Sequence, residues 1–390
     1  MFSFKLYDFK KYDVILLASV LILSALGAFC IYNSDGQSMF KHQIMGIFLG
    51  LLIIVFLSIV DYHFICKFVI LYYLVGVAVL FMVRFTRFGV DHTTGAYRWL
   101  DVGFTEVQPS ELVKIILILT MAAFLNKFQN KMDKFYVFVL ACIITAIPTF
   151  LILIQTDLSS SMVMIFIFVI MIFSAGLSFK IIIPVVAVGV PVAVSLFWYV
   201  QQPFQKLLTS YQQERILSFL NPETYANSGQ YQQNKSIIAI SSGGLYGKFF
   251  TEGAESAARK YNYVYVNESD FIFSVLGEEL GFFGSLLVIA LFALIIIRCI
   301  RIANRSADHE GRMIAMGVSG MIMFQSFANI GVATAILPNT GLPLPFLSFG
   351  LSSLLGSMIS IGLILNVGLY RSNTRPTHVS EYADISFDLD

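Results

Sequence analysis

Long apolar runs, separated by shorter polar segments, repeat along almost the whole chain. A helix needs about 20 mostly apolar residues to cross a bilayer. Ten segments qualify approximately: 14–32, 43–60, 64–83, 110–126, 135–154, 160–176, 180–200, 271–298, 313–337 and 346–369. The pattern predicts an all-α integral membrane protein with about ten transmembrane helices, in a single polytopic domain over residues 1–370. Lys10 and Lys11 precede the first run as in a signal peptide, but the run is long for one, so we expect an uncleaved helix.

Basic residues indicate how these spans are oriented, because short cytoplasmic loops carry an excess of Lys and Arg. With the N-terminus inside, the inner segments hold Lys5, Lys10, Lys11, Lys67, Lys127, Lys131, Lys134, Lys180, Arg298, Arg301, Arg305, Arg312, Arg371 and Arg375. The outer segments are then 84–109, a large loop at about 201–270, and a hairpin around Pro338 to Pro345. Both termini are expected in the cytoplasm, and the polar, increasingly acidic residues 371–390 are expected to form a disordered tail.

Composition agrees with a membrane protein: 57% of the residues are hydrophobic and 13% are charged, whereas soluble domains carry about 25% charged residues. The net charge of +1 gives no indication of nucleic-acid binding. The four cysteines lie within apolar runs, so we expect free thiols and no disulfide framework. The five histidines are scattered singly, and no metal-ligand set is evident.

Two outer connections, the segment 84–109 and the turn between spans five and six, carry charges at span ends. Arg98 lies in the segment 84–109, and Pro109 suits the first turn of the span that places Glu111 and Lys114 three residues apart on one face. Opposite charges just inside a membrane helix are costly unless they serve a cavity, but a structural ion pair and an interfacial anchor are the alternatives. Asp157 lies between two apolar runs, either as a functional carboxylate or as a cap of the next span.

The large outer loop contains Tyr231, Gln232 and Ser236, followed by the glycine-rich run Ser242-Gly243-Gly244-Leu245-Tyr246-Gly247-Lys248. The spacing does not match a Walker motif, because position 242 is serine. Backbone N–H groups of such a loop could still bind a pyrophosphate. This signal is weak by itself.

Asp270 stands where this loop ends and a long apolar run begins. A carboxylate at a helix start is favoured in its ionised form by the helix dipole, whereas burial disfavours that form. The simplest interpretation is a helix cap, and a cap is compatible with catalysis. Glu278 and Glu279 follow two turns deeper, and one of them could face a cavity.

Five linked motifs resemble the SEDS family, the wall polymerases typified by RodA, FtsW and SpoVE, across roughly residues 14 to 369. Residues 95–101 and 108–114 resemble GxxRWL…QPSEhhK, where h is apolar, and residues 155–158 resemble the QPDLG turn. Residues 231–248 resemble YQ…S…AIGSGGLxGKG, residues 270–281 resemble TDFIFAVxGEELG, and residues 337–353 resemble LPxTGhPLPFhSYGGSS. The departures are Thr156, Ser159, Lys235, Glu268, Ser269 and Leu351.

The resemblance implies a peptidoglycan glycosyltransferase that polymerises lipid II at the outer face of the bacterial cytoplasmic membrane. The prolines of the last motif are closer to RodA, which serves cell elongation, than to FtsW, which serves division. The resemblance implies a class B penicillin-binding protein as partner, docked on the apolar faces of spans eight and nine, where Ile322 is a test position.

The chemistry fits this assignment, since transfer from a lipid pyrophosphate to a sugar hydroxyl needs a base and positive charge for the departing pyrophosphate. Asp270 is the expected base, and Arg98 and Lys114 the expected pyrophosphate ligands, with Glu111 and Asp157 holding these cations in one outward-facing cavity. The motif residues Tyr231, Gln232 and Ser236 are further candidates for substrate binding.

No cofactor is evident, although Asp270 and a substrate pyrophosphate could share a divalent cation such as Mg²⁺ or Mn²⁺. The alternatives are a lipid II flippase, a non-catalytic scaffold for wall synthesis, and another lipid-linked sugar enzyme such as an O-antigen ligase. The linked motifs argue against the last of these.

Overall fold

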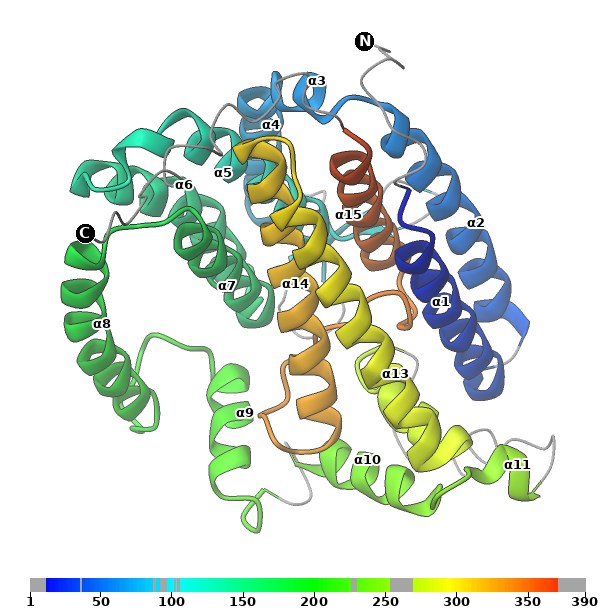
Figure 1. Ribbon diagram of the computed structural model, residues 1–390. Helices are drawn as coiled ribbons and strands as arrows, with labels where there is room; N and C mark the ends of the chain where they lie inside the picture. Colours follow the sequence, from blue (N-terminus) through cyan, green and yellow to red (C-terminus); the bar gives the residue numbers. More distant parts are fainter. Residues whose placement is uncertain are drawn as a thin grey trace, which may run out of the picture.

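Ten long helices form the molecule, which is described by a computed structural model over residues 12–35, 37–86, 89–91, 97–101, 103, 106–225, 230–252 and 269–370. The helices are α1 (Val14–Asp35), α2 (Gln37–Ile59), α4 (Val69–Phe85), α5 (Pro109–Lys127), α6 (Phe135–Ile154), α7 (Leu158–Ser174), α8 (Phe179–Val200), α13 (Ile272–Asn304), α14 (His309–Ala333) and α15 (Leu351–Leu369). Eight of them are long and apolar enough to span a membrane, and α4 and α7 are apolar helices of 17 residues. The predicted multi-span helical architecture is confirmed (Figure 1).

Several predicted boundaries differ from the structure by a few residues, and two of the differences have a structural cause. The third span is divided into the short helix α3 (Tyr62–Cys66) and α4, with the break at Lys67 and Phe68. The last helix begins at Leu351 rather than near 346, because residues 338–350 form an irregular segment that carries Pro343, Pro345 and two glycines of positive φ, Gly341 and Gly350. Apolar composition alone does not separate such a segment from the helix that follows it.

The centre of the bundle is α14, which packs against α13, α7, α5 and α15 (Figure 1). In its most apolar window 72% of the residues are buried, against 6% for α8. The prediction that span nine offers a free apolar face for a partner is therefore wrong: Ile322 is fully buried in α14. Of α13 and α14, α13 carries most of the exposed large apolar side chains, including Phe282, Phe283, Leu286, Leu287 and Ile289, whereas α14 contributes Phe327.

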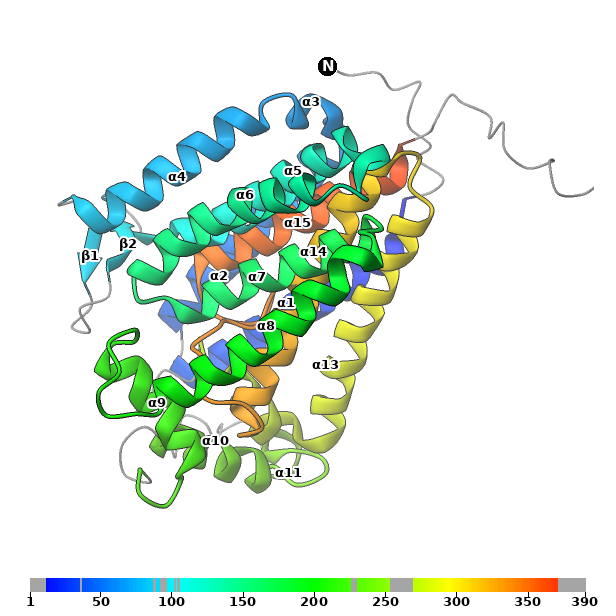
Figure 2. The same cartoon turned by 90° about the vertical axis from the view of Figure 1, so that its left-hand side faces the viewer.

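Smaller elements gather at one end of the bundle. The helices α9 (Ser210–Leu220), α10 (Tyr231–Ser242) and α11 (Lys248–Glu252) lie at the end opposite α3 (Figure 1). The strands β1 (Gly89–Asp91), β2 (Tyr97–Asp101) and β3 (Glu106–Val107) form an antiparallel sheet in this order at the far end of α4 from α3 (Figure 2). A 3₁₀ turn at Gln129–Lys131 joins α5 to α6.

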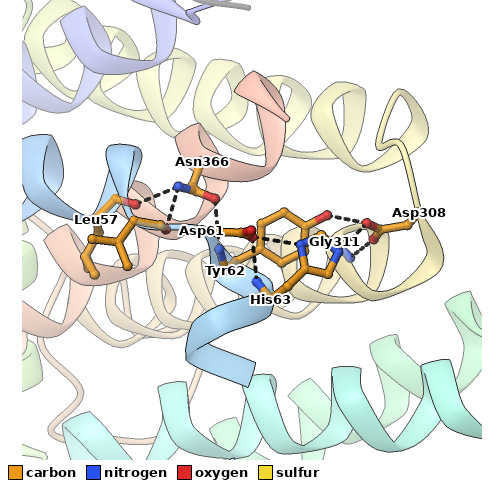
Figure 3. Close-up of polar contacts among 8 residues, drawn as sticks. Leu57, Asp61, Tyr62, His63, Asp308, Gly311 and Asn366 are labelled. Carbon is orange, nitrogen blue, oxygen red and sulfur yellow. Dashed lines mark hydrogen bonds and ion pairs between the residues drawn. The ribbon is translucent and has the colours of Figure 1, made fainter. Parts of the chain in front are cut away.

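A polar cluster ties α3 to α14 and α15 at the other end (Figure 3). The imidazole of His63 lies 2.8 Å from both Asp61 Oδ1 and Asp308 Oδ2, and the Tyr62 hydroxyl donates to Asp308 over 2.5 Å. Asp308 also caps α14 by accepting from the Gly311 N–H. Asn366, near the end of α15, donates to the Leu57 and Val60 carbonyls that end α2.

The start of α1 lies at this same end, because Asp13 pairs with Arg298 near the end of α13 over 2.8 Å. The first helix therefore begins where the last helix ends, as an even number of spans requires. The predicted tail 371–390, the lysines at positions 5, 10 and 11 and the departure at Glu268 lie outside the described residues.

Candidate active site

Asp270 precedes α13 and does not cap it. The N-cap residue is Phe271, and the carboxyl of Asp270 instead accepts a hydrogen bond from the Ser269 hydroxyl over 3.3 Å. The main chain of Asp270 is held from α14: Asn329 Nδ2 donates to the Asp270 carbonyl over 2.9 Å and to the Leu342 carbonyl over 2.7 Å. The simpler interpretation of Asp270 as a helix cap is therefore wrong, and its carboxyl is available for another role.

Arg215 on α9 lies beside this carboxyl, with Gly341 close to both. A Cβ added to Gly341 would lie 3.1 Å from Asp270 Oδ2 and 3.5 Å from Arg215 Nη1. Burial raises the pKa of Asp270 above its ordinary value, while the charge of Arg215, the Ser269 hydroxyl and the charge of Arg98 oppose this rise. A carboxyl whose pKa is raised toward the working pH is a better general base than an ordinary aspartate.

A cavity of about 410 Å³ lies between α7, α9, α14 and the segment after α14. Asp270 does not line this cavity, but its neighbour Arg215 does. Its polar lining comes from Arg98, Thr156, Ser159, Gln212, Arg215, Asn339 and Thr340. The rest of the wall is mostly apolar and includes Leu158, Met162, Phe197, Phe219, Phe324 and Phe327. This lining contains two guanidinium groups and no carboxylate, so the cavity suits an anion that carries a hydrocarbon part.

The Thr156 carbonyl joins two of the cavity walls. It accepts from Arg98 Nη2 over 2.5 Å and from Gln212 Nε2 over 3.1 Å. Thr156 has a φ of 63°, in the left-handed region that a β-branched residue rarely adopts. The carbonyl of this strained turn between α6 and α7 therefore holds the side chains of Arg98 on β2 and Gln212 on α9 close to each other.

The other predicted charged residues lie close by but not in the cavity wall. Asp157 caps α7 by accepting from the Ser160 N–H over 3.0 Å, and Gln108 Nε2 lies 3.3 Å from its other oxygen. Lys114 and Glu111 form a buried ion pair on α5, with 2.8 Å between Nζ and Oε1. Of the four charges predicted to share one cavity, only Arg98 lines it.

The motif residues of α10 contact the end of α14 and the segment that follows it. Ser236 is fully buried and donates to the Ala333 carbonyl, and Gln232 accepts from Asn339 Nδ2 over 3.2 Å. Tyr231 is exposed, with Lys235 Nζ 5.5 Å from its ring centre. Gln232 therefore reaches a residue of the cavity wall, whereas Ser236 holds the main chain beside it.

The glycine-rich loop packs against α13. Gly281 has a φ of 65° where α13 kinks, and a Cβ at Gly247 would overlap the Glu279 carbonyl. The Gly244 and Leu245 carbonyls accept from the Phe282 and Phe283 N–H groups at this kink. These glycines allow two main chains to meet. Glu278 faces Lys248 of this loop and Glu279 is fully buried, so neither lines the cavity.

Sequence reasoning missed Gln212, Arg215, Asn339 and Thr340. The sequence does indicate that some of these residues share a helix face. Positions 212, 215, 216 and 219 of α9 have the spacing of one face, and all four line the cavity. Nothing in the local sequence indicated what that face would contact.

Comparison with known proteins places these features in a family. The FtsW/RodA/SpoVE family model, described as cell cycle protein, matches residues 7–373. The chain is 32% identical to the probable peptidoglycan glycosyltransferase FtsW of Bacillus subtilis, over 93% of this chain and 91% of that protein. It is also 32% identical to the peptidoglycan glycosyltransferase MrdB of Escherichia coli, over 94% of this chain and 95% of that protein.

Solved structures agree with this assignment. A chain from a peptidoglycan synthase complex that coordinates polymerization and crosslinking is 27% identical, with a TM-score of 0.75 over 93% of this chain and 97% of that one. Thermus thermophilus RodA, at 24% identity, shares the fold with a TM-score of 0.64 over 93% of this chain and 96% of that one. With its ten helices and five linked motifs, the chain belongs to the FtsW/RodA/SpoVE family.

Proposed function

We propose that this protein is a peptidoglycan glycosyltransferase that polymerises lipid II, with Asp270 as its general base. The proposal rests on one observation. Asp270 lies near Arg215, and Arg215 and Arg98 line a cavity whose remaining wall is mostly apolar. The names of the relatives support polymerisation over the alternatives of a flippase or a scaffold. The identities to FtsW and MrdB are equal, so the assignment to elongation rather than division rests on the prolines of the last motif.

In the proposed reaction, Asp270 accepts a proton and Arg98 stabilises the departing diphosphate. The acceptor hydroxyl gives its proton to Asp270 as its oxygen bonds to the anomeric carbon of the donor. The bond between that carbon and the diphosphate oxygen breaks, and the electron pair leaves with the diphosphate. Arg98 lies where it can stabilise this developing charge, since guanidinium groups bind phosphate oxygens in a bidentate manner.

The proposed orientation places α9, α10 and the cavity at the outer face of the bacterial cytoplasmic membrane, with both termini inside. The basic loops at the α3 end support it. The proposed partner is a class B penicillin-binding protein, because a similar chain occurs in a peptidoglycan synthase complex. Its membrane anchor would dock on the exposed apolar side chains of α13, such as Phe283 and Leu287.

A divalent cation remains part of the proposal. Within the part of the chain that the structure describes, no three His, Cys, Asp or Glu side chains lie close enough to hold a metal ion together. Mg²⁺ or Mn²⁺ would therefore enter with the substrate diphosphate, and Asp270 is the carboxylate beside the cavity that could share it.

The test is glycan synthesis from purified lipid II by the protein in nanodiscs, alone and with its partner. Asp270→Asn keeps the shape of the side chain but removes the base, so we expect the rate to fall by about 10²–10⁴-fold. The control is Asp133→Asn, an exposed carboxylate in the loop between α5 and α6, which should leave the rate unchanged. Polymerisation by the Asp270 variant at the normal rate would favour a flippase or scaffold.

A further inference from the structure

The helix α9 presents one mixed face to the cavity. Gln212 and Arg215 lie toward its first half, and Ile216 and Phe219 continue the face as apolar residues. Since residues at i, i+3, i+4 and i+7 share one side of a helix, this face carries a polar and then an apolar portion. A ligand along it would meet a cation at one end and hydrocarbon at the other.

Two guanidinium groups supply the positive charge of this cavity. Arg98 from β2 and Arg215 from α9 both line it, whereas Lys114 is fully buried and paired with Glu111 on α5. One guanidinium group can bind one phosphoryl group. A monophosphate has one phosphoryl group, whereas a diphosphate has two. The pair therefore fits a diphosphate better than a monophosphate.

Several buried polar atoms beside these cations point to a polar ligand. Arg98 Nε, Asn339 Oδ1 and Thr340 Oγ1 have no hydrogen-bond partner among the described residues, and all three residues line the cavity. A buried polar atom without a partner is costly, so such atoms call for an explanation. They offer one donor, one acceptor and one hydroxyl, a set that suits phosphate and sugar oxygens together.

Arg98 is also held in a fixed position relative to the start of α9, the helix that carries Arg215. The Thr156 carbonyl accepts from Arg98 and from Gln212, one helical turn before Arg215. The capping box of Thr209 and Gln212 fixes the start of α9. This arrangement limits the entropy that the Arg98 guanidinium would lose on binding a ligand.

We propose that Arg215 is a further catalytic residue, which with Arg98 binds the diphosphate of the lipid-linked donor and neutralises the charge on the departing diphosphate. This inference rests on the proposed function. In the structure, the Arg215 guanidinium lies near the Asp270 carboxylate, and Gly341 is close to both. When the donor binds, the guanidinium contacts the diphosphate, and it stabilises the leaving group while Asp270 accepts the proton.

The first experiment measures binding of a C15 prenyl diphosphate and of the matching monophosphate to the protein in nanodiscs. Arg215→Gln should weaken diphosphate binding about tenfold or more and reduce the preference for diphosphate over monophosphate, and Arg215→Lys should restore part of it. Glu214→Gln on α9, which does not line the cavity, is the matched control. Equal diphosphate binding by a folded Arg215→Gln variant would overturn the inference.

The second experiment follows polymerisation of lipid II against pH. Without Arg215 the Asp270 carboxylate loses its principal cationic neighbour, so the acid limb of the rate profile should move to higher pH in Arg215→Gln and less in Arg215→Lys. A merely structural role would lower the rate without moving this limb. Absence of polymerisation by the unaltered protein would contradict the proposed function, whereas the binding experiment would still decide the role of Arg215.

Discussion

Lys248 Nζ lies 2.7 Å from Glu278 Oε1, and both side chains are buried where the glycine-rich loop meets α13. Removal of one member of such a pair leaves a buried charge, at a cost of about 3–5 kcal/mol. We therefore expect Lys248→Met to lower the melting temperature of the detergent-solubilised protein strongly. The double variant Lys248→Met with Glu278→Met should recover most of this loss. A double variant as unstable as the single one would show that the two charges are not coupled.

His63 makes the stability of the α3 end dependent on pH. Burial lowers the pKa of His63, but its hydrogen bonds to Asp308 and Asp61 outweigh this and raise it from 6.5 to about 9. The charged imidazole therefore stabilises the fold fully below about pH 6.5, and this contribution is lost as the pH rises to about 9.

The expected loss is on the order of 1–3 kcal/mol after allowance for partial exposure to solvent. Thermal melting between pH 6 and 9.5 measures it. The melting temperature of His63→Gln should stay close to the value that the unaltered protein has at pH 9.5, and it should not show this dependence on pH. If the unaltered protein and His63→Gln respond to pH in the same way, the imidazole does not carry the charge assigned to it.

Substitutions of Thr156 test the two hydrogen bonds through which its carbonyl joins Arg98 to Gln212 of α9. Glycine has no steric penalty at a φ of 63°, so Thr156→Gly should be as stable as the unaltered protein or more stable by up to about 1 kcal/mol. Proline fixes φ near −65° and would turn the carbonyl away from Arg98 and Gln212. Thr156→Pro should therefore reduce polymerisation of lipid II more than tenfold. Normal activity of this variant, which restores the usual proline of the QPDLG pattern, would show that the link is dispensable.

The exposed side of α13 is the proposed docking surface for the partner. Phe283→Ala combined with Leu287→Ala should reduce copurification of a class B penicillin-binding protein, because both side chains are about half exposed. The matched control is Val188→Ala with Val190→Ala on α8, which is exposed and apolar along its length. A loss of copurification with the α8 variant alone would move the docking surface to that helix.

Topology can be checked with reporters fused after Asn126 and after Gln230. Asn126 lies at the end of α5 away from the cavity, and Gln230 precedes α10 at the cavity end. The two fusions should report opposite sides of the membrane. Signals from the same side would contradict the proposed orientation and the span count between them.

The helices were predictable from sequence because each span needs its own long apolar run, and that requirement leaves a local signal. The end of the irregular segment, residues 346–350, was merged into the last span, since a non-helical segment buried by its neighbours can be as apolar as a helix. The division at Lys67 was missed for a similar reason, because the apolar residues continue on both sides of it.

The site was less predictable than the fold. Asp270 was found because it stands at a polar-to-apolar boundary, but its neighbour Arg215 comes from a helix 55 positions earlier, and only the folded chain brings them together. Lys114 was expected beside the substrate because a lysine inside a membrane helix is costly. Its pairing with Glu111 meets that cost within a single turn of α5.

The side-chain amide of Asn329 donates two hydrogen bonds to main-chain carbonyls. One goes to Asp270, just before α13, and the other to Leu342, in the segment after α14. Gly341, the neighbour of Leu342, is the residue between Asp270 and Arg215. If α14 tilts as the bilayer thickens or thins, the proposed proton acceptor Asp270 and the segment after α14 would therefore move together. The proposed geometry of the site would thus be kept when the membrane deforms, through a side chain for which we assign no contact with substrate.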